Sequence, residues 1–152
     1  MTSLKPLVQP AGGGKKVNVL VNVIRIVVHS RDTGGTFSVV ETNDGAQEGP
    51  PPHIHHREDE TLHVLEGEYE FNVGGKTHRV GKGATVVGPR DVAHAYKCVS
   101  AGGGRMLVFF SPGGFERFFE EVDALGPPEK QEIPRVMELG LKYGLEFLPP
   151  PA

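Results

Sequence analysis

The sequence has a single cysteine, no excess of basic residues and no long apolar segment. Cys98 is the only cysteine among 152 residues, which excludes an intramolecular disulfide framework. Lysine and arginine number 16 against 19 aspartate and glutamate, and the net charge of −3 argues against a nucleic-acid partner. The longest apolar run, residues 17–28, is interrupted by Asn18, Asn22 and Arg25 and is too short to cross a bilayer.

Residues 1–16 are polar and glycine-rich, and they lack the apolar segment of a secretory signal peptide. Together with the lone cysteine, this leads us to expect a cytoplasmic protein with no membrane partner. We also expect these residues to form a flexible arm. The length of the chain fits one domain with a sizeable core.

Glycine (21 residues) and proline (13 residues) are abundant, and short valine-rich runs separate them, which favours an all-β domain. Residues 17–29 are rich in β-branched side chains and are predicted to form one long strand. Shorter strands are predicted at 36–42, 61–65, 68–73, 76–80, 84–87, 94–99 and 105–111. Strands at such regular spacing, with glycine turns between them, indicate a sandwich or barrel over residues 17–112.

The pattern changes after Ser111. Phenylalanines at helical spacing predict a helix over residues 115–125, and a second helix is predicted over 129–143. Residues 145–148 are predicted to be a tail. We expect the whole segment 113–152 to pack on the barrel and to cover its mouth.

The stretch from Gly49 to Gly67 carries the chemistry. His53 and His55 are two residues apart, so on an extended strand both side chains point to the same face. Glu60 follows closely enough for a turn to bring its carboxylate beside the imidazoles. Two imidazoles and a carboxylate on one face predict a first-row transition-metal site. His94, at the start of a later strand, is a fourth candidate ligand.

These residues stand in two patterns that resemble the cupin motifs, Gly49…His53-x-His55-x4-Glu60-x6-Gly67 and Gly83-x5-Pro89-x-Asp91-x2-His94. The position that is commonly Asn at the end of the second motif is Cys98. Over residues 17–148 the chain resembles single-domain cupins described as quercetin 2,3-dioxygenase-like. The resemblance implies a double-stranded β-helix, a jelly-roll barrel with C-terminal α-helices, and a homodimer.

The resemblance also implies a metal centre. Its ligands would be His53, His55, Glu60 and His94, holding one divalent transition metal (Fe, Mn, Ni, Co, Cu or Zn). The implied activity is that of a dioxygenase using O2 on a small aromatic or enolisable hydroxy-ketone, with Glu60 as the group that accepts a proton. The alternatives are a non-redox isomerase, cyclase or decarboxylase, and a non-catalytic cupin that binds a metal or a small molecule.

Other residues have two possible roles. Five side chains in phase with the candidate ligands form either a substrate pocket wall or ordinary barrel filling: Leu62, Val64, Phe71, Tyr96 and Cys98. His56 is predicted to lie behind the ligands or face solvent, and His63 to lie outside the barrel. His29 and His78 are predicted at the surface, and Glu58 and Asp59 in a solvated turn.

Overall fold

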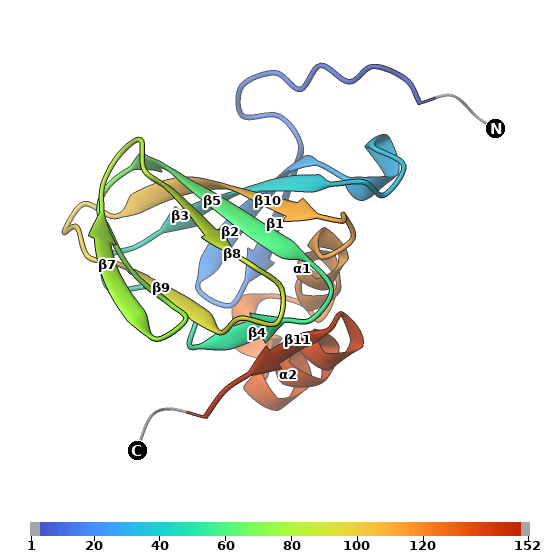
Figure 1. Ribbon diagram of the computed structural model, residues 1–152. Helices are drawn as coiled ribbons and strands as arrows, with labels where there is room; N and C mark the ends of the chain where they lie inside the picture. The colour runs from blue at the N-terminus through green and yellow to red at the C-terminus, as the bar shows by residue number, and fades with distance from the viewer. Residues whose placement is uncertain (1–3, 150–152) are drawn as a thin grey trace.

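The computed structural model describes residues 4–149 and consists of two antiparallel sheets with two C-terminal helices (Figure 1). The all-β fold with C-terminal helices is as predicted. In spatial order, the six-stranded sheet consists of β1 (Lys15–Val19), β2 (Asn22–Val28), β3 (Ser38–Asp44), β10 (Gly104–Ser111), β5 (Asp59–Glu66) and β8 (Thr85–Gly88). The five-stranded sheet consists of β11 (Leu145–Phe147), β4 (His53–His55), β9 (His94–Cys98), β6 (Tyr69–Val73) and β7 (Lys76–Val80).

The predicted long strand over residues 17–29 is wrong, because the chain reverses in the middle of it. β1 and β2 pair as a hairpin, with Val19 opposite Asn22, and Leu20 in the turn has a φ of 54°. This turn has no glycine. Its backbone is held instead by Gln131, which accepts a hydrogen bond from the Leu20 N–H (2.6 Å) and donates one to the Asn18 carbonyl (2.8 Å). A partner so distant in sequence leaves no local turn signal.

The predicted tail is also wrong, since residues 145–147 form strand β11. This strand pairs with β4 in antiparallel register, with Leu145 opposite His55 and Phe147 opposite His53. Both strands have only three residues, and two hydrogen bonds extend the pairing: His56 N–H to the Gly144 carbonyl and Leu148 N–H to the Pro52 carbonyl, each 2.9 Å. The C-terminal segment therefore supports the strand that carries two of the candidate ligands.

The two helices are α1 (Glu116–Asp123) and α2 (Ile133–Lys142), with short 3-10 turns at Ser30–Asp32 (η1) and Pro128–Lys130 (η2). α2 begins later than predicted because η2 precedes it and Pro134 lies in its first turn. The helices lie at one end of the sandwich, beside β4 and β11 (Figure 1). Neither they nor any other helix in residues 4–149 is long and apolar enough to cross a membrane.

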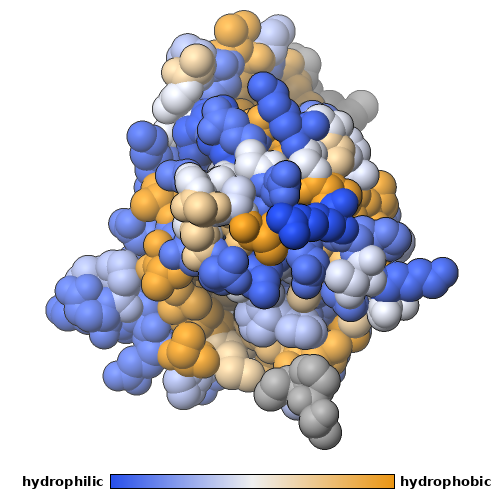
Figure 2. Space-filling model, turned by 90° about the vertical axis from the view of Figure 1, so that its left-hand side faces the viewer, coloured by the Kyte–Doolittle hydropathy of each residue, from blue (hydrophilic) through white to orange (hydrophobic). Residues whose placement is uncertain are grey.

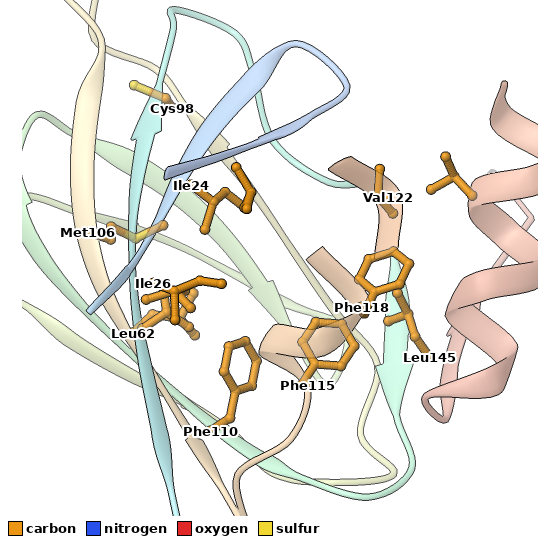
Figure 3. Close-up of a cluster of buried hydrophobic side chains, with 14 of the residues drawn as sticks. Ile24, Ile26, Leu62, Cys98, Met106, Phe110, Phe115, Phe118, Val122 and Leu145 are labelled. Carbon is orange, nitrogen blue, oxygen red and sulfur yellow. The ribbon is translucent and has the colours of Figure 1, made fainter. Parts of the chain in front are cut away.

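The hydrophobic core runs from between the sheets to the helices. Figure 3 shows Phe115, the residue before α1, and Phe118 of α1 between Ile24 on β2 and Leu145 on β11. The opposite end of the sandwich is polar. On the face drawn in Figure 2, hydrophilic side chains predominate, with smaller hydrophobic patches between them. β7, at the edge of its sheet, has exposed residues along most of its length, and charged side chains protect such an edge from pairing.

His29 is buried, and its predicted place at the surface is wrong. Its side chain is 9% exposed and lies between two carboxylates of α1. The Nε2 atom is 2.8 Å from Glu120 and the Nδ1 atom 3.4 Å from Glu116. These contacts attach α1 to the end of β2. His78, in contrast, is exposed as predicted.

Candidate metal centre

Three strands bring the predicted ligands together. His53 on β4 pairs directly with His94 on β9, and His55 projects from the same face of β4 as His53. Glu60 reaches the imidazoles from β5 in the other sheet. One nitrogen or oxygen atom from each of these four side chains lies within 4.8 Å of the others, and all four residues are buried.

The imidazole rings are oriented by their outer nitrogens. His53 Nδ1 lies 2.9 Å from the Pro51 carbonyl oxygen, and His94 Nδ1 lies 3.4 Å from that of Val92. A ring that donates from Nδ1 keeps the Nε2 lone pair free for a metal. Near the centre, Glu60 Oε2 is 2.7 Å from His94 Nε2 and 3.1 Å from His55 Nε2.

Two glycines allow the close approaches on which this geometry depends. A Cβ on Gly49 would lie 1.9 Å from the Tyr96 carbonyl oxygen, so only glycine lets the loop before β4 pass β9 so closely. A Cβ on Gly88 would lie 2.8 Å from His94 Nδ1. Gly88 pairs with Glu60 across β8 and β5, and its bare backbone leaves room for the His94 ring beside that carboxylate.

Burial and neighbouring charges shift the pKa values of candidate ligands in opposite directions. Burial lowers the pKa of His53 to about 4. Burial also opposes charge on His55, but the carboxylates of Glu58 and Glu60 outweigh it and raise the pKa of His55 to about 9. Burial would raise the pKa of Glu60, whereas its contacts with His55 and His94 prevail and hold that pKa below its ordinary value. Glu60 is therefore ionised, with its charge balanced by a proton on His55.

The donor set fits a divalent transition metal. Three imidazole nitrogens and one carboxylate oxygen are ligands that such ions prefer, and here all four converge within a buried site. Four protein ligands would leave one or two positions open on a five- or six-coordinate ion.

A cavity of about 370 Å³ opens beside the centre, and His53, His55 and Glu60 reach its wall. Its other walls are mostly apolar and come from three places: the β1–β2 turn with Leu20, helix α1 with Phe115 and Phe118, and the strand β11 with Leu145 and Phe147. The predicted cover of the barrel mouth thus corresponds to residues of α1 and β11 that line the cavity. Sequence reasoning missed the contributions of the β1–β2 turn and β11, because it recognised neither element.

The structure separates the five predicted pocket residues. Tyr96 lines the cavity, and its pKa is raised well above the ordinary value because the phenol is buried. Within residues 4–149 the Tyr96 hydroxyl has no hydrogen-bond partner. The other four side chains are buried in the core and do not line this cavity: Leu62, Val64, Phe71 and Cys98.

The remaining histidines near the centre lie outside it, as predicted. The side chain of His56 is 44% exposed and contacts Asp91 and Glu146, each at 2.7 Å. His63 lies on the outer face of β5 and contacts the Thr85 hydroxyl at 2.8 Å.

Glu58 corrects the prediction of a solvated turn. It is 4% exposed, and its Oε2 atom lies 3.7 Å from Nδ1 of His55. Asp59 is partly exposed and pairs with Arg90 at 3.1 Å. The burial of Glu58 was not predicted because a run of three acidic residues is typical of a surface loop.

The sequence of the chain matches the cupin domain family over residues 38–110, a range that contains all four candidate ligands. Together with the two-sheet fold, this match identifies residues 38–110 as a cupin domain. It is similar to quercetin 2,3-dioxygenase of Bacillus subtilis (strain 168), with 27% identity over 128 residues, or 84% of this chain. The chain spans only 37% of the length of that relative.

Solved structures share the fold at low sequence identity. KdgF from Halomonas sp. superposes with a TM-score of 0.66 at 19% identity, covering 74% of this chain and 99% of its own. The polyketide cyclase RemF from Streptomyces resistomycificus superposes with a TM-score of 0.59 at 22% identity, covering 72% of this chain and 80% of its own. These likenesses establish the double-stranded β-helix architecture.

Proposed function

We propose that this cupin is a metal-dependent dioxygenase that acts on a small aromatic or enolisable hydroxy-ketone. The observation that carries the proposal is the position of the three-histidine, one-glutamate group at the wall of an apolar cavity. The sequence similarity to a quercetin 2,3-dioxygenase supports it independently. His53, His55, Glu60 and His94 would hold the ion, which would supply Lewis acidity and an open position for O2.

The cavity indicates which substrates can enter. Within residues 4–149, no lysine or arginine lines it, so away from the metal centre the wall offers no basic side chain for a phosphate or a sugar acid. Phenylalanine rings from α1 and β11 form much of the wall and suit a planar, uncharged molecule. The Tyr96 hydroxyl, which lacks a partner within the described chain, is a donor for a substrate oxygen. We therefore expect a neutral substrate with an aromatic ring and a hydroxyl group.

Glu60 would accept the proton of the substrate hydroxyl. Its lowered pKa means that the carboxylate is already ionised at neutral pH and can accept a proton without first losing one. A carboxylate of low pKa is a weak base, so the transfer requires a substrate hydroxyl made more acidic by the metal. Burial among apolar side chains excludes water, which would otherwise compete for the same proton.

Oxygen consumption tests the proposal. Metal-loaded protein mixed with a flavonol in an oxygen-electrode cell should consume O2 in proportion to flavonol lost. Glu60→Gln should abolish this consumption, while Glu66→Gln, an exposed site on the same strand, should retain it. Metal-loaded protein that consumes no O2 with flavonols or simpler hydroxy-ketones would contradict the proposal.

A non-redox reaction is the second candidate. A metal on the same ligand set can act as a Lewis acid without a change in oxidation state, and the structural likeness to a polyketide cyclase supports this candidate. Conversion of an enolisable substrate by the zinc-loaded protein under anaerobic conditions would favour an isomerase, cyclase or decarboxylase. A metal-loaded protein that converts nothing would favour a binding role.

A further inference from the structure

We propose that Glu58 is a positioning residue of the metal centre, which accepts a hydrogen bond from Nδ1 of His55 and fixes that imidazole for metal binding. The inference rests on the proposed function only in requiring that the four-residue group binds a metal.

The outer nitrogens of the three histidines have different partners. His53 and His94 each place Nδ1 near a backbone carbonyl, that of Pro51 or Val92. His55 has no such carbonyl. Its Nδ1 atom is buried and lacks a hydrogen bond within the described residues, and the buried Oε2 atom of Glu58 lacks one too. These two orphaned atoms lie 3.7 Å apart.

A buried donor and a buried acceptor left unpaired destabilise the fold, so their placement side by side calls for a reason. The gap of 3.7 Å is about 0.5 Å longer than an N–H···O hydrogen bond and closes with a small movement of either side chain. When Nε2 of His55 is bound to a metal, the proton must be on Nδ1, and Glu58 is the acceptor in reach. A carboxylate behind a ligating histidine makes the imidazole a stronger ligand.

The test compares metal affinity and ligand geometry in four proteins: wild type, Glu58→Gln, Glu58→Ala and the exposed control Glu66→Gln. Affinity for Co²⁺ is measured by competition with a chelator at pH 9. A carboxylate behind His55 makes the imidazole bind a proton more tightly as well as a metal, and at high pH the proton competes less. Loss of the carboxylate typically lowers metal affinity about 10- to 100-fold. We expect the affinity for Co²⁺ to fall from wild type to Glu58→Gln to Glu58→Ala, because the amide oxygen of glutamine still accepts a hydrogen bond. The affinity of the control Glu66→Gln should stay within about twofold of wild type.

The visible absorption of the Co²⁺-loaded proteins distinguishes positioning from packing. At saturating Co²⁺, the spectrum of Glu58→Ala should differ from that of wild type, because a His55 ring without its outer partner changes the ligand field. Equal affinities in wild type and both Glu58 variants would overturn the inference while leaving the metal centre intact. Weaker binding with an unchanged spectrum and a lower melting temperature of the metal-free variant would also overturn it, in favour of packing. A wild-type protein that binds no Co²⁺ would refute the proposed function and this inference together.

Discussion

Metal binding is expected to raise the thermal stability of the protein, because the candidate ligands connect its two sheets. His53, His55 and His94 belong to the five-stranded sheet and Glu60 to the six-stranded sheet. An ion that needs all four is bound by the folded chain and not by the unfolded one. It therefore stabilises the fold by RT ln(1 + [metal]/Kd), which is about 2.7 kcal/mol at a free concentration 100 times Kd.

The expected change in melting temperature follows from the chain length. For a protein of this size, 1 kcal/mol corresponds to roughly 2–4 °C, so the expected rise is about 5–11 °C. A further tenfold increase in free metal should add about 1.4 kcal/mol, or roughly 3–6 °C. The assay is thermal unfolding of chelator-treated protein, followed by circular dichroism, with free Zn²⁺ or Mn²⁺ fixed by a metal buffer.

Two variants separate a bound ion from a general salt effect. Glu60→Gln keeps the size of the side chain but loses the carboxylate, and it should lose most of the metal-dependent rise. Glu66→Gln removes an exposed carboxylate from the end of the same strand and should keep the full rise. Equal rises in both variants, or no rise in wild-type protein at any metal concentration, would refute the reasoning.

Three further substitutions test the packing, the charges and the cavity. Leu145→Ala should lower the free energy of unfolding in urea by about 2–5 kcal/mol, because Leu145 is only 4% exposed. The control Leu141→Ala should change it by less than about 0.5 kcal/mol, because Leu141 is 66% exposed. Glu116 is buried, but its hydrogen bonds with Ser30 outweigh burial and hold its pKa below the usual 4.5. A carboxyl group whose pKa is lowered by folding stabilises the fold at pH values above its pKa in the unfolded chain. This stabilisation is lost as the pH falls through its pKa in the folded protein. Wild type should thus exceed Glu116→Gln in stability by about 1–3 kcal/mol at pH 7, and urea titrations below pH 4.5 should show the gap closing. Tyr96→Phe should raise KM for a hydroxylated substrate about five- to tenfold and leave the urea midpoint unchanged, since the phenol oxygen lacks a partner within residues 4–149.

The sequence predicted those parts of the fold and site that depend on local patterns. The strand at residues 76–80 has the predicted bounds, because glycines flank it on both sides. The four ligands implied by the resemblance to cupins come together. Strand spacing alone predicted the shared face of His53 and His55, whereas the place of His94 beside them followed from the resemblance. The hairpin turn at Leu20 was missed, because its backbone groups are satisfied by Gln131 from beyond the barrel.

The remaining errors concern charged side chains whose partners are distant in sequence. His29 was predicted at the surface, yet carboxylates of α1 make its burial possible. Glu58 was placed in a solvated turn because it stands among other acidic residues. Its burial becomes understandable only when the His55 ring is seen beside it. Local composition describes what a side chain prefers, and a partner on another element can reverse that preference.

β11 changes how the site and its cover are related. The sequence led us to treat residues 113–152 as a cover that is separate from the metal centre. In the structure, Leu145 and Phe147 pair with His55 and His53, and the same two residues line the cavity. One short strand thus pairs with the strand β4, which carries two candidate ligands, and also forms part of the cavity wall. Because β4 has only three residues and pairs with β9 at a single position, β11 supplies most of its pairing. We therefore predict that a change in β11 will alter both metal affinity and the shape of the cavity.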